Sequence, residues 1–323
     1  MDKKSFRIIF MGTPDFAVES LKILTENNYN IAAVVTNPDK PAGRGQKIKE
    51  SAVKKYAISK GLHVLQPSKL KDEHFREEIS KLKPSLQVVV AFKILPPSIF
   101  TIPTHGTFNL HASLLPQYRG AAPINHAIIN GEKETGVTTF FLDENIDTGK
   151  IIDQRKVSIA ETDTAGTLHD KLMTSGAELV KSTIDSIINQ TYSIIPQDNL
   201  GHKFKELKKA PKIFNEDCRI NWNMDINELH NFIRGLSPYP SAWTEFIDTE
   251  GNRKKTKMFY SEPVAENHNY KIGSILSDQK NYLKVAAKNG FLNIKQLQLE
   301  GKKKMQTEEF LRGIRNLDKC IFL

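Results

Sequence analysis

The first 190 residues alternate short apolar runs with longer amphipathic stretches. The runs Phe6–Met11, Ile31–Thr36 and Ser85–Phe92 are rich in aliphatic and β-branched residues, which predicts strands buried on both faces of a parallel sheet. The stretch Thr164–Asn189 has apolar residues at helical spacing and predicts a long helix. We therefore predict a doubly wound, Rossmann-like α/β domain with a mostly parallel sheet over residues 1–190.

After residue 241 the pattern changes to short strand-like runs separated by turns. Five runs of this length are typical of a small β-barrel of OB type. We therefore predict a second domain of this type over residues 213–323. Residues 191–212 combine Pro and Gly with several lysines and predict a basic linker between the two domains. The five runs are Ala242–Ile247, Lys257–Tyr260, Ile272–Leu276, Leu283–Ala287 and Phe291–Gln298.

One predicted strand of the first domain carries three polar side chains on the same face. Alternation from Phe108 onward places Asn109, His111 and Ser113 on one side of the strand and apolar residues on the other. Ligands of open α/β sheets bind at the carboxyl ends of the strands, so this row predicts a functional site. The alternative is a core strand whose polar groups are hydrogen-bonded to their neighbours.

Two glycine-containing loops in the same domain match no nucleotide-binding motif. The loop after the first strand, Gly12–Phe16, lacks the second and third glycines of the dinucleotide fingerprint, which disfavours NAD. The loop Asn37–Lys49 is basic and rich in Gly and Pro, but it contains no Walker A sequence. Arg44 could hold a phosphate as a forked donor, or the whole loop could be a solvated surface loop.

Composition and charge narrow the class of protein. The 323 residues suffice for two domains, each with its own core. Residues 201–323 hold 22 Lys+Arg against 15 Asp+Glu, so +7 of the total charge of +9 lies there, which indicates a polyanion partner or a solvated basic surface. With two cysteines, no leader sequence and no apolar run long enough to span a bilayer, we expect a soluble cytoplasmic protein without a metal.

A turn crowded with carboxylates, Asp143–Gly149, supplies a candidate acid or base. Such turns are commonly only solvated, but the position of this one after the next strand could aim Asp147 at His111. A Ser-His-Asp hydrolase is disfavoured because the chain has no Gly-x-Ser-x-Gly elbow at Ser113. A metal site built from His105, His111 and Asp147 lacks a recognised ligand spacing.

Asn109, His111 and Asp147 together fit acyl transfer to an amine better than hydrolysis. The tetrahedral oxyanion needs a preorganised donor, which the Asn109 amide can supply. His111 can take the proton of the amine or act as a second donor, and Asp147 can fix its tautomer and raise its basicity. A free α-amino group is partly neutral at cellular pH, so no covalent intermediate is required.

The motifs that contain these residues are specific. The chain has Asn-Leu-His-Ala-Ser-Leu-Leu-Pro over 109–116, Tyr-Arg-Gly-Ala-Ala-Pro over 118–123 and Asp-Thr-Gly over 147–149, and in these it resembles the folate-dependent formyltransferases. Met11–Ala17, the Lys40–Gly45 loop, Trp222 and Pro238–Trp243 are similar to the branch of that family that acts on methionyl-tRNA. The similarity runs nearly from end to end.

This resemblance implies a reaction and a set of catalytic residues. The formyl donor would be 10-formyltetrahydrofolate, and the acceptor would be the α-amine of methionine on initiator methionyl-tRNA. Asn109, His111 and Asp147 match the catalytic residues of the family. Whether His111 acts as a base or as an oxyanion donor stays open. We expect a monomer.

The resemblance also implies binding residues for both substrates. The family's folate-contacting segment corresponds to Ser113, Leu114, Leu115 and Pro116, and the loop with Phe92 and Leu95 is expected at the same pocket. The pair Phe92-Lys93 departs from the Tyr-Gly pair common in the family and adds a charge there. For the tRNA, the resemblance implies contacts at Arg44, Lys47, Phe16 and Lys212, with the basic second domain holding the tRNA body.

Three other functions remain as alternatives. One is a folate-dependent formyltransferase for a small amine, such as an amino-sugar nucleotide or glycinamide. The second is release of formate to water, and the third is an RNA-binding protein without enzymatic activity. The basic last third and the Arg44 loop favour tRNA, because small acceptors need neither.

Overall fold

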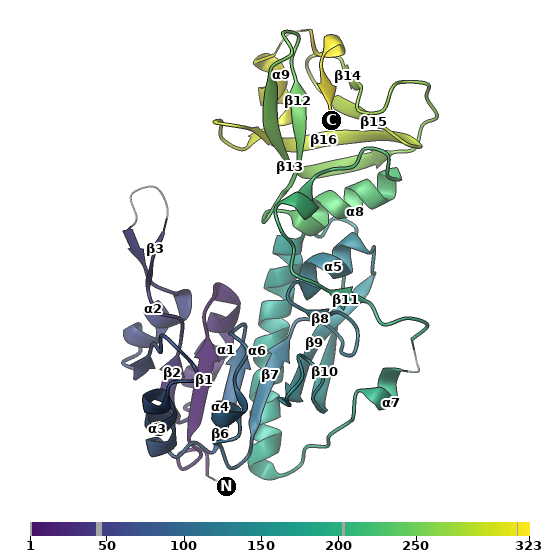
Figure 1. Ribbon diagram of the computed structural model, residues 1–323. Coiled ribbons are helices and arrows are strands. Elements are labelled where there is room, and N and C mark those ends of the chain that lie inside the picture. The colour runs from purple at the N-terminus through teal and green to yellow at the C-terminus, as the bar shows by residue number, and fades with distance from the viewer. Residues whose placement is uncertain (1, 43–46, 202–203, 315) are drawn as a thin grey trace. The chain divides into compact units, whose positions relative to one another are not determined.

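The chain forms two compact units, which Figure 1 shows coloured from the N-terminus to the C-terminus in a computed structural model. The structure describes residues 2–42, 47–201, 204–314 and 316–323. Unit 1 comprises Met1–Gly120, Glu134–Ser158 and His169–Lys209, and unit 2 comprises Ala121–Lys133, Ile159–Leu168 and Ala210–Leu323.

Unit 1 is built on a seven-stranded sheet with the order β10-β9-β7-β6-β1-β2-β5. The five strands from β7 to β5 are parallel, whereas β9 is antiparallel to β7 and β10 is antiparallel to β9. Every residue of β1 and β6 is buried, which explains their continuous apolar sequence and confirms the predicted sheet. The strands are β1 (Ile8–Gly12), β2 (Ile31–Val35), β5 (Val64–Leu65), β6 (Leu86–Val90), β7 (Thr107–His111), β9 (Glu134–Phe141) and β10 (Ile151–Ser158).

Helices connect these strands, and several of these helices were not predicted from the sequence. The predicted long helix is present, but α2, α4 and α7 are short and were not predicted. The Ser51 hydroxyl caps α2 by accepting a hydrogen bond from the backbone of Lys54 at 3.0 Å. The helices are α1 (Asp15–Glu26), α2 (Ala52–Ser59), α3 (Glu73–Lys81), α4 (Pro97–Phe100), α6 (Ala165–Asn189) and α7 (Asp198–Gly201).

Helix α6 packs closely on one face of β7, and this contact sets the direction of the polar row. A Cβ added at Gly176 would lie 2.7 Å from a methyl carbon of Leu110, so a larger residue would require Leu110 or the helix to move. Leu110 is 3% exposed. Because successive side chains alternate across a strand, Asn109 and His111 point to the opposite face of the sheet.

Residues 40–42 and 47–49 form a short ribbon where the sequence predicts only a loop. Strands β3 (Lys40–Ala42) and β4 (Lys47–Lys49) pair antiparallel on either side of residues outside the description. The Lys54 ammonium joins the two ends of the ribbon, since it forms ion pairs with Asp39 and, at 2.9 Å, with Glu50. Hydrogen bonds from Lys54 and Gln66 to the Asp39 carboxylate lower the pKa of this group.

Unit 2 contains an antiparallel, barrel-like sheet with the order β14-β15-β16-β13-β12-β18, and β17 pairs with β16. A bridge between Ser274 and Ile321 brings the two ends of the sheet together, so the predicted small barrel is confirmed and nearly closed. It has seven strands instead of five. The strands are β12 (Ala242–Ile247), β13 (Arg253–Val264), β14 (Ile275–Ser277), β15 (Leu283–Ala287), β16 (Gly290–Leu299), β17 (Met305–Gln306) and β18 (Ile321–Phe322).

Helix α8 (Ile226–Leu236) packs against α5 (Pro123–Ile129) and β13 in the same unit. A Cβ added at Gly235 would lie 2.6 Å from Ile129, which shows how close α5 and α8 are. The remaining short elements are β8 (Arg119–Gly120), β11 (Lys209–Ala210), the 3-10 turns η1 (Glu216–Cys218) and η2 (Leu317–Lys319), and α9 (Thr307–Arg312). Among the described helices, none is both long and apolar enough to cross a bilayer.

Candidate active site

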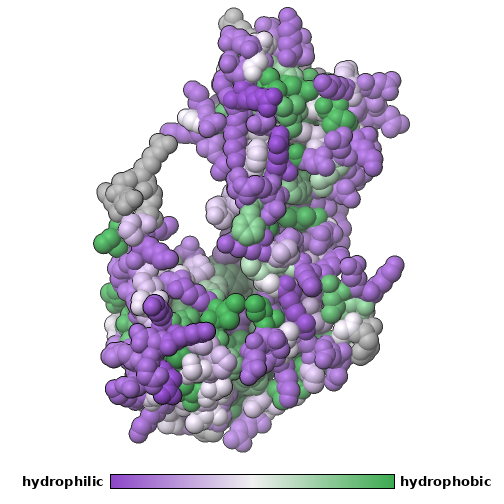
Figure 2. Space-filling model, viewed as in Figure 1, coloured by the Kyte–Doolittle hydropathy of each residue, from purple (hydrophilic) through white to green (hydrophobic). Residues whose placement is uncertain are grey.

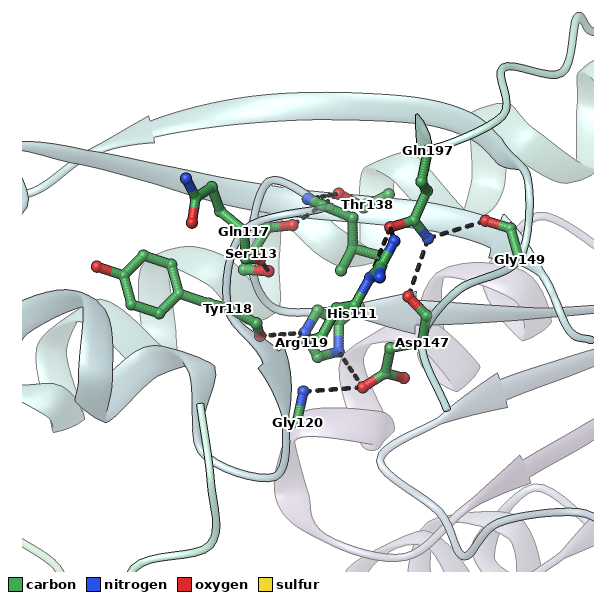
Figure 3. A network of polar contacts seen from close by, with 11 residues as sticks. His111, Ser113, Gln117, Tyr118, Arg119, Gly120, Thr138, Asp147, Gly149 and Gln197 are labelled. Atoms are coloured by element: carbon green, nitrogen blue, oxygen red, sulfur yellow. Dashed lines mark hydrogen bonds and ion pairs between the residues drawn. The ribbon is translucent and has the colours of Figure 1, made fainter. Parts of the chain in front are cut away.

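The His111 imidazole is buried and is held on both sides (Figure 3). Its Nε2 lies 2.9 Å from the backbone carbonyl oxygen of Tyr118. A carbonyl oxygen only accepts hydrogen bonds, so Nε2 carries a proton and Nδ1 is the nitrogen with the free lone pair in neutral His111. Nδ1 faces the Asp147 carboxylate, with Oδ2 at 3.9 Å. The tautomer is therefore set by Tyr118, and not by Asp147 as the sequence analysis expected.

Asp147 is placed by its own backbone and by a neighbouring loop. Its φ of +56° lies in the left-handed region, which is uncommon for residues other than glycine. Its Oδ2 accepts a hydrogen bond from the backbone N–H of Gly120 at 3.0 Å. The Asp147 carbonyl oxygen accepts a second hydrogen bond from Gln197. The carboxylate is thus turned toward His111, and the side chain is 15% exposed.

The neighbouring carboxylate of Asp143 has a different task. Its Oδ1 accepts hydrogen bonds from the backbone of Asn145 at 2.9 Å and from the Thr148 hydroxyl at 2.7 Å. These bonds fold the turn that precedes Asp147. The loop therefore combines one carboxylate that shapes it with one that faces the imidazole.

Asn109 lies next to His111 on β7 and is half-buried. Its side-chain amide makes no hydrogen bond to the part of the chain that the structure describes. The amide is partly exposed, so it can pair with water or with a bound molecule. The role of Asn109 as oxyanion donor stays a prediction.

Ser113 is fully buried and is not oriented by His111. Its hydroxyl donates to the carbonyl oxygen of Gln117 at 2.6 Å, and its own carbonyl accepts from the Thr138 hydroxyl at 2.6 Å. Both nitrogens of His111 face other groups. This geometry does not support a serine nucleophile.

The segment after Ser113 forms a buried turn. Leu115 packs with Phe140 and Ile151, and its backbone N–H and C=O are both bonded, to Thr138 and Gln154 respectively. Pro116 is buried and Leu114 is half-buried. The turn therefore has a fixed backbone beside the row of polar side chains.

No group of three or more His, Cys, Asp or Glu suited to a metal occurs among the described residues.

Comparisons with known proteins agree over almost the whole chain. A family profile described as "Formyl transferase" matches residues 6–184, and "Formyl transferase, C-terminal domain" matches residues 212–315. Methionyl-tRNA formyltransferases from Parabacteroides distasonis and Phocaeicola vulgatus are 54% and 55% identical to the chain, each over 98% of both proteins. The chain belongs to the methionyl-tRNA formyltransferase family. The family predicted from the motifs is thus confirmed.

Solved structures of other formyltransferases share the fold. An N-formyltransferase from Helicobacter canadensis, in complex with folinic acid and dTDP-3-aminofucose, is 27% identical with a TM-score of 0.61, over 94% of this chain and 100% of that chain. HypX from Aquifex aeolicus, in complex with tetrahydrofolic acid, is 17% identical with a TM-score of 0.62, over 94% of this chain and 46% of that one. At that identity, HypX supports the fold alone.

The remaining site residues predicted for this family member are spread over both units. Leu95 is buried in the core of unit 1, and Phe92 packs against the same core. Phe16 is 6% exposed, and its ring meets the edge of His169 with centroids 5.2 Å apart. In unit 2, the Lys212 ammonium lies 5.0 Å from the ring centroid of Phe214. Arg44 and the side chain of Lys47 lie outside the described residues.

Sequence reasoning missed the groups that hold the pair of His111 and Asp147. These are the Tyr118 carbonyl, the Gly120 N–H, and the side chains of Arg119 and Gln197. Residues 118–120 stand inside a motif that was noticed, but backbone donors and acceptors have no signature in a sequence. Gln197 stands in the segment 191–212, and no pattern around it points to the site.

Proposed function

We propose that the protein transfers the formyl group of 10-formyltetrahydrofolate to the α-amino group of methionine on initiator methionyl-tRNA. The observation that carries this proposal is the 54% identity to a methionyl-tRNA formyltransferase over 98% of both chains. The site geometry supports it, because the Asn109 amide and the His111 imidazole lie on one face of β7 and the Asp147 carboxylate faces the imidazole.

Asn109 is assigned to the oxyanion of the tetrahedral intermediate. When the amine nitrogen bonds to the formyl carbon, the formyl oxygen gains negative charge, and a preorganised amide donor in a half-buried site stabilises it without reorganisation. The lack of a described partner for the Asn109 amide supports this role. The donor would otherwise have to break an existing hydrogen bond first.

His111 is assigned to proton transfer. The amine loses one proton as its bond to the formyl carbon forms, and the folate nitrogen gains one as its bond to that carbon breaks. Because Nε2 is occupied by the Tyr118 carbonyl, the proton is taken up at Nδ1, beside Asp147. Asp147 stabilises the resulting imidazolium. The same proton is then available to the leaving nitrogen.

The substrate contacts follow from the family's motifs and remain part of the proposal. The Ser113–Pro116 turn, together with Phe92 and Leu95, would contact the folate. Support comes from the fixed backbone of this turn beside Asn109. Because Phe92 and Leu95 are mostly enclosed by the core of unit 1, we assign them to the wall of the folate pocket. Phe16, which is 6% exposed, stays assigned to the acceptor end of the tRNA.

The tRNA is assigned to the segment that contains Arg44 and Lys47 and to unit 2, including Lys212. The visible face of the barrel is largely hydrophilic (Figure 2). On unit 2, cations lie beside aromatic rings: the Lys255 ammonium is 3.8 Å from the ring centroid of Trp243. Such surfaces suit phosphates and bases.

We further infer how the chain is divided and in what form it acts. Residues 1–190 would carry formyl transfer, 191–212 a basic linker, and 213–323 the tRNA contacts, in a monomer that works in the cytoplasm. Size-exclusion chromatography with light scattering should give the mass of one chain. A stable dimer would contradict the monomer.

A formylation assay tests the proposed reaction. The protein is mixed with 10-formyltetrahydrofolate and either charged initiator tRNA or an amino-sugar nucleotide, the latter because the Helicobacter relative was crystallised with dTDP-3-aminofucose. We expect formylation of the methionine on the initiator tRNA and none of the amino-sugar nucleotide. Formylation of the amino-sugar nucleotide without formylation of the methionyl-tRNA would overturn the proposal. His111→Ala should lower kcat by about 10²-fold or more while tRNA binding stays unchanged.

A further inference from the structure

A chain of side-chain hydrogen bonds runs from Arg119 through Gln197 to the Asp147 loop (Figure 3). The Gln197 Oε1 accepts from Arg119 Nε at 3.0 Å and from Nη2 at 2.6 Å. The Gln197 Nε2 donates to the carbonyl oxygens of Asp147 and Gly149, both at 2.9 Å. Gln197 is 3% exposed, so this amide is fully used inside unit 1.

The orientation of this amide is fixed from both sides. A guanidinium has only donors, so Arg119 requires the oxygen of Gln197 to face it. Backbone carbonyls have only acceptors, so the loop requires the NH2 group. Rotating the amide by half a turn would set donors against donors and acceptors against acceptors. Arg119 therefore determines which end of Gln197 reaches the loop.

The loop held in this way needs support. Asp147 has a positive φ, which costs a non-glycine residue on the order of 1 kcal/mol or more and persists only where surrounding contacts stabilise it. Its carboxylate accepts a hydrogen bond from the Gly120 backbone N–H, and its carbonyl oxygen accepts one from the Gln197 side chain. Each contact fixes a different part of the residue. Without Gln197, the backbone that aims the carboxylate would have lost its described side-chain anchor.

We propose that Gln197 is a positioning residue for Asp147 and that Arg119 acts through Gln197; this rests on the proposed role of Asp147 in formyl transfer. The three consecutive residues Tyr118, Arg119 and Gly120 then serve one purpose. Tyr118 holds His111, Gly120 holds the Asp147 carboxylate, and Arg119 holds the Asp147 backbone through Gln197.

Kinetics of Gln197→Ala and Gln197→Glu test the proposal. Glu keeps the size of the side chain and an acceptor for Arg119, but it removes both donors and faces two carbonyl oxygens. We expect kcat to fall about 10- to 100-fold in both variants, because displacement of a reacting group by about 1 Å can cost about 10²-fold. The KM values for the folate donor and for methionyl-tRNA should stay within about threefold. A kcat equal to that of the wild type would overturn the proposal.

A double-mutant cycle separates positioning from a general loss of structure. If Gln197 acts through Asp147, Gln197→Ala should change kcat less than about twofold in an Asp147→Ala background. If the two effects multiply, Gln197 does not act through Asp147. The matched control is Gln66→Ala, because the Gln66 amide also donates twice, to the Asn37 carbonyl and to Asp39, both at 2.9 Å. Its effect should multiply with that of Asp147→Ala.

The Arg119→Lys and Asp147→Ala variants distinguish failure of the positioning proposal from failure of folding or of the proposed function of Asp147. If the Gln197 variants do not fold, Arg119→Lys replaces a fork with a single point donor and should show the same fall in kcat and the same coupling to Asp147. If Asp147→Ala itself keeps full activity, the proposed function of Asp147 fails. If Asp147→Ala is inactive but the Gln197 and Arg119 variants are unimpaired, only the positioning proposal fails.

Discussion

Removing the charge of Asp147 while keeping its shape tests the catalytic pair most directly. In Asp147→Asn, the side-chain oxygen can still accept the Gly120 N–H, so the loop should keep its form. The substitution removes the electrostatic attraction between the Asp147 carboxylate and the imidazolium of His111. The two charged atoms are 3.9 Å apart, and the two side chains are 7% and 15% exposed.

The expected loss follows from these distances. For two unit charges about 4 Å apart, the attraction is about 4 kcal/mol at an effective dielectric constant of about 20, and about 1 kcal/mol in bulk water. The low exposure of both side chains favours the larger value. About 4 kcal/mol in the barrier corresponds to a kcat about 10³-fold lower, whereas about 1 kcal/mol corresponds to about fivefold.

Single-turnover formyl transfer at saturating folate donor and methionyl-tRNA measures this loss. The matched control is Asp143→Asn in the same turn, because an amide oxygen can still accept from Asn145 and Thr148; its rate should stay within about twofold of the wild type. A folded Asp147→Asn that loses less than fivefold would refute the reasoning, since the pair would then interact no more strongly than in water.

Three further predictions concern the loop, unit 2 and the tRNA. Gly149→Ala should lower kcat more than about tenfold, because its Cβ would lie 1.7 Å from the Phe141 carbonyl oxygen, whereas Gly201→Ala meets nothing within 4 Å and should leave kcat unchanged. Burial, and then the charge of Arg234, lower the pKa of His230 from its ordinary 6.5. As the pH falls, the unfolded state therefore takes up a proton on His230 before the folded state does. The free energy of unfolding should thus fall as pH drops below about 6.5, and His230→Gln should remove that part of the slope in denaturant titrations. Affinity for tRNA, measured by filter binding, should fall about 10³-fold between 50 and 200 mM salt if about six phosphates are contacted, and a flat response would count against unit 2 as the tRNA surface.

The parts of the fold that the sequence predicts are those where burial dictates residue type. β1 and β6 are enclosed on both faces, so their sequences are continuously apolar and recognisable. The ribbon of β3 and β4 is mostly exposed and short, so its pairing has no hydrophobic signature. β18 has only two residues and depends on partners distant in sequence. Its presence could not be predicted from local pattern.

The site shows the same division. Asn109 and His111 could be placed on one face because alternation along a strand is a local rule. The sequence motifs named Asp147 as their partner, and the structure brings it to Nδ1 of His111 even though β9, the strand that precedes its loop, is antiparallel to β7. The tautomer of His111 depends on a backbone carbonyl, and Gln197 lies fifty residues away from Asp147 along the chain. Neither contact is encoded in a local pattern.

The close approach of Gly176 to Leu110 links helix α6 to the strand that carries Asn109 and His111. A side chain at position 176 would meet the end of the Leu110 side chain, so either Leu110 changes its rotamer or helix α6 moves away from β7, the strand that carries Asn109 and His111. The side chains of Ile94 and Ile146 are 72% and 59% exposed, so changes at these positions would leave that contact untouched. Substitutions at those two exposed positions, with Asp147 and strand β7 left unchanged, should therefore be tolerated more easily than any change at Gly176.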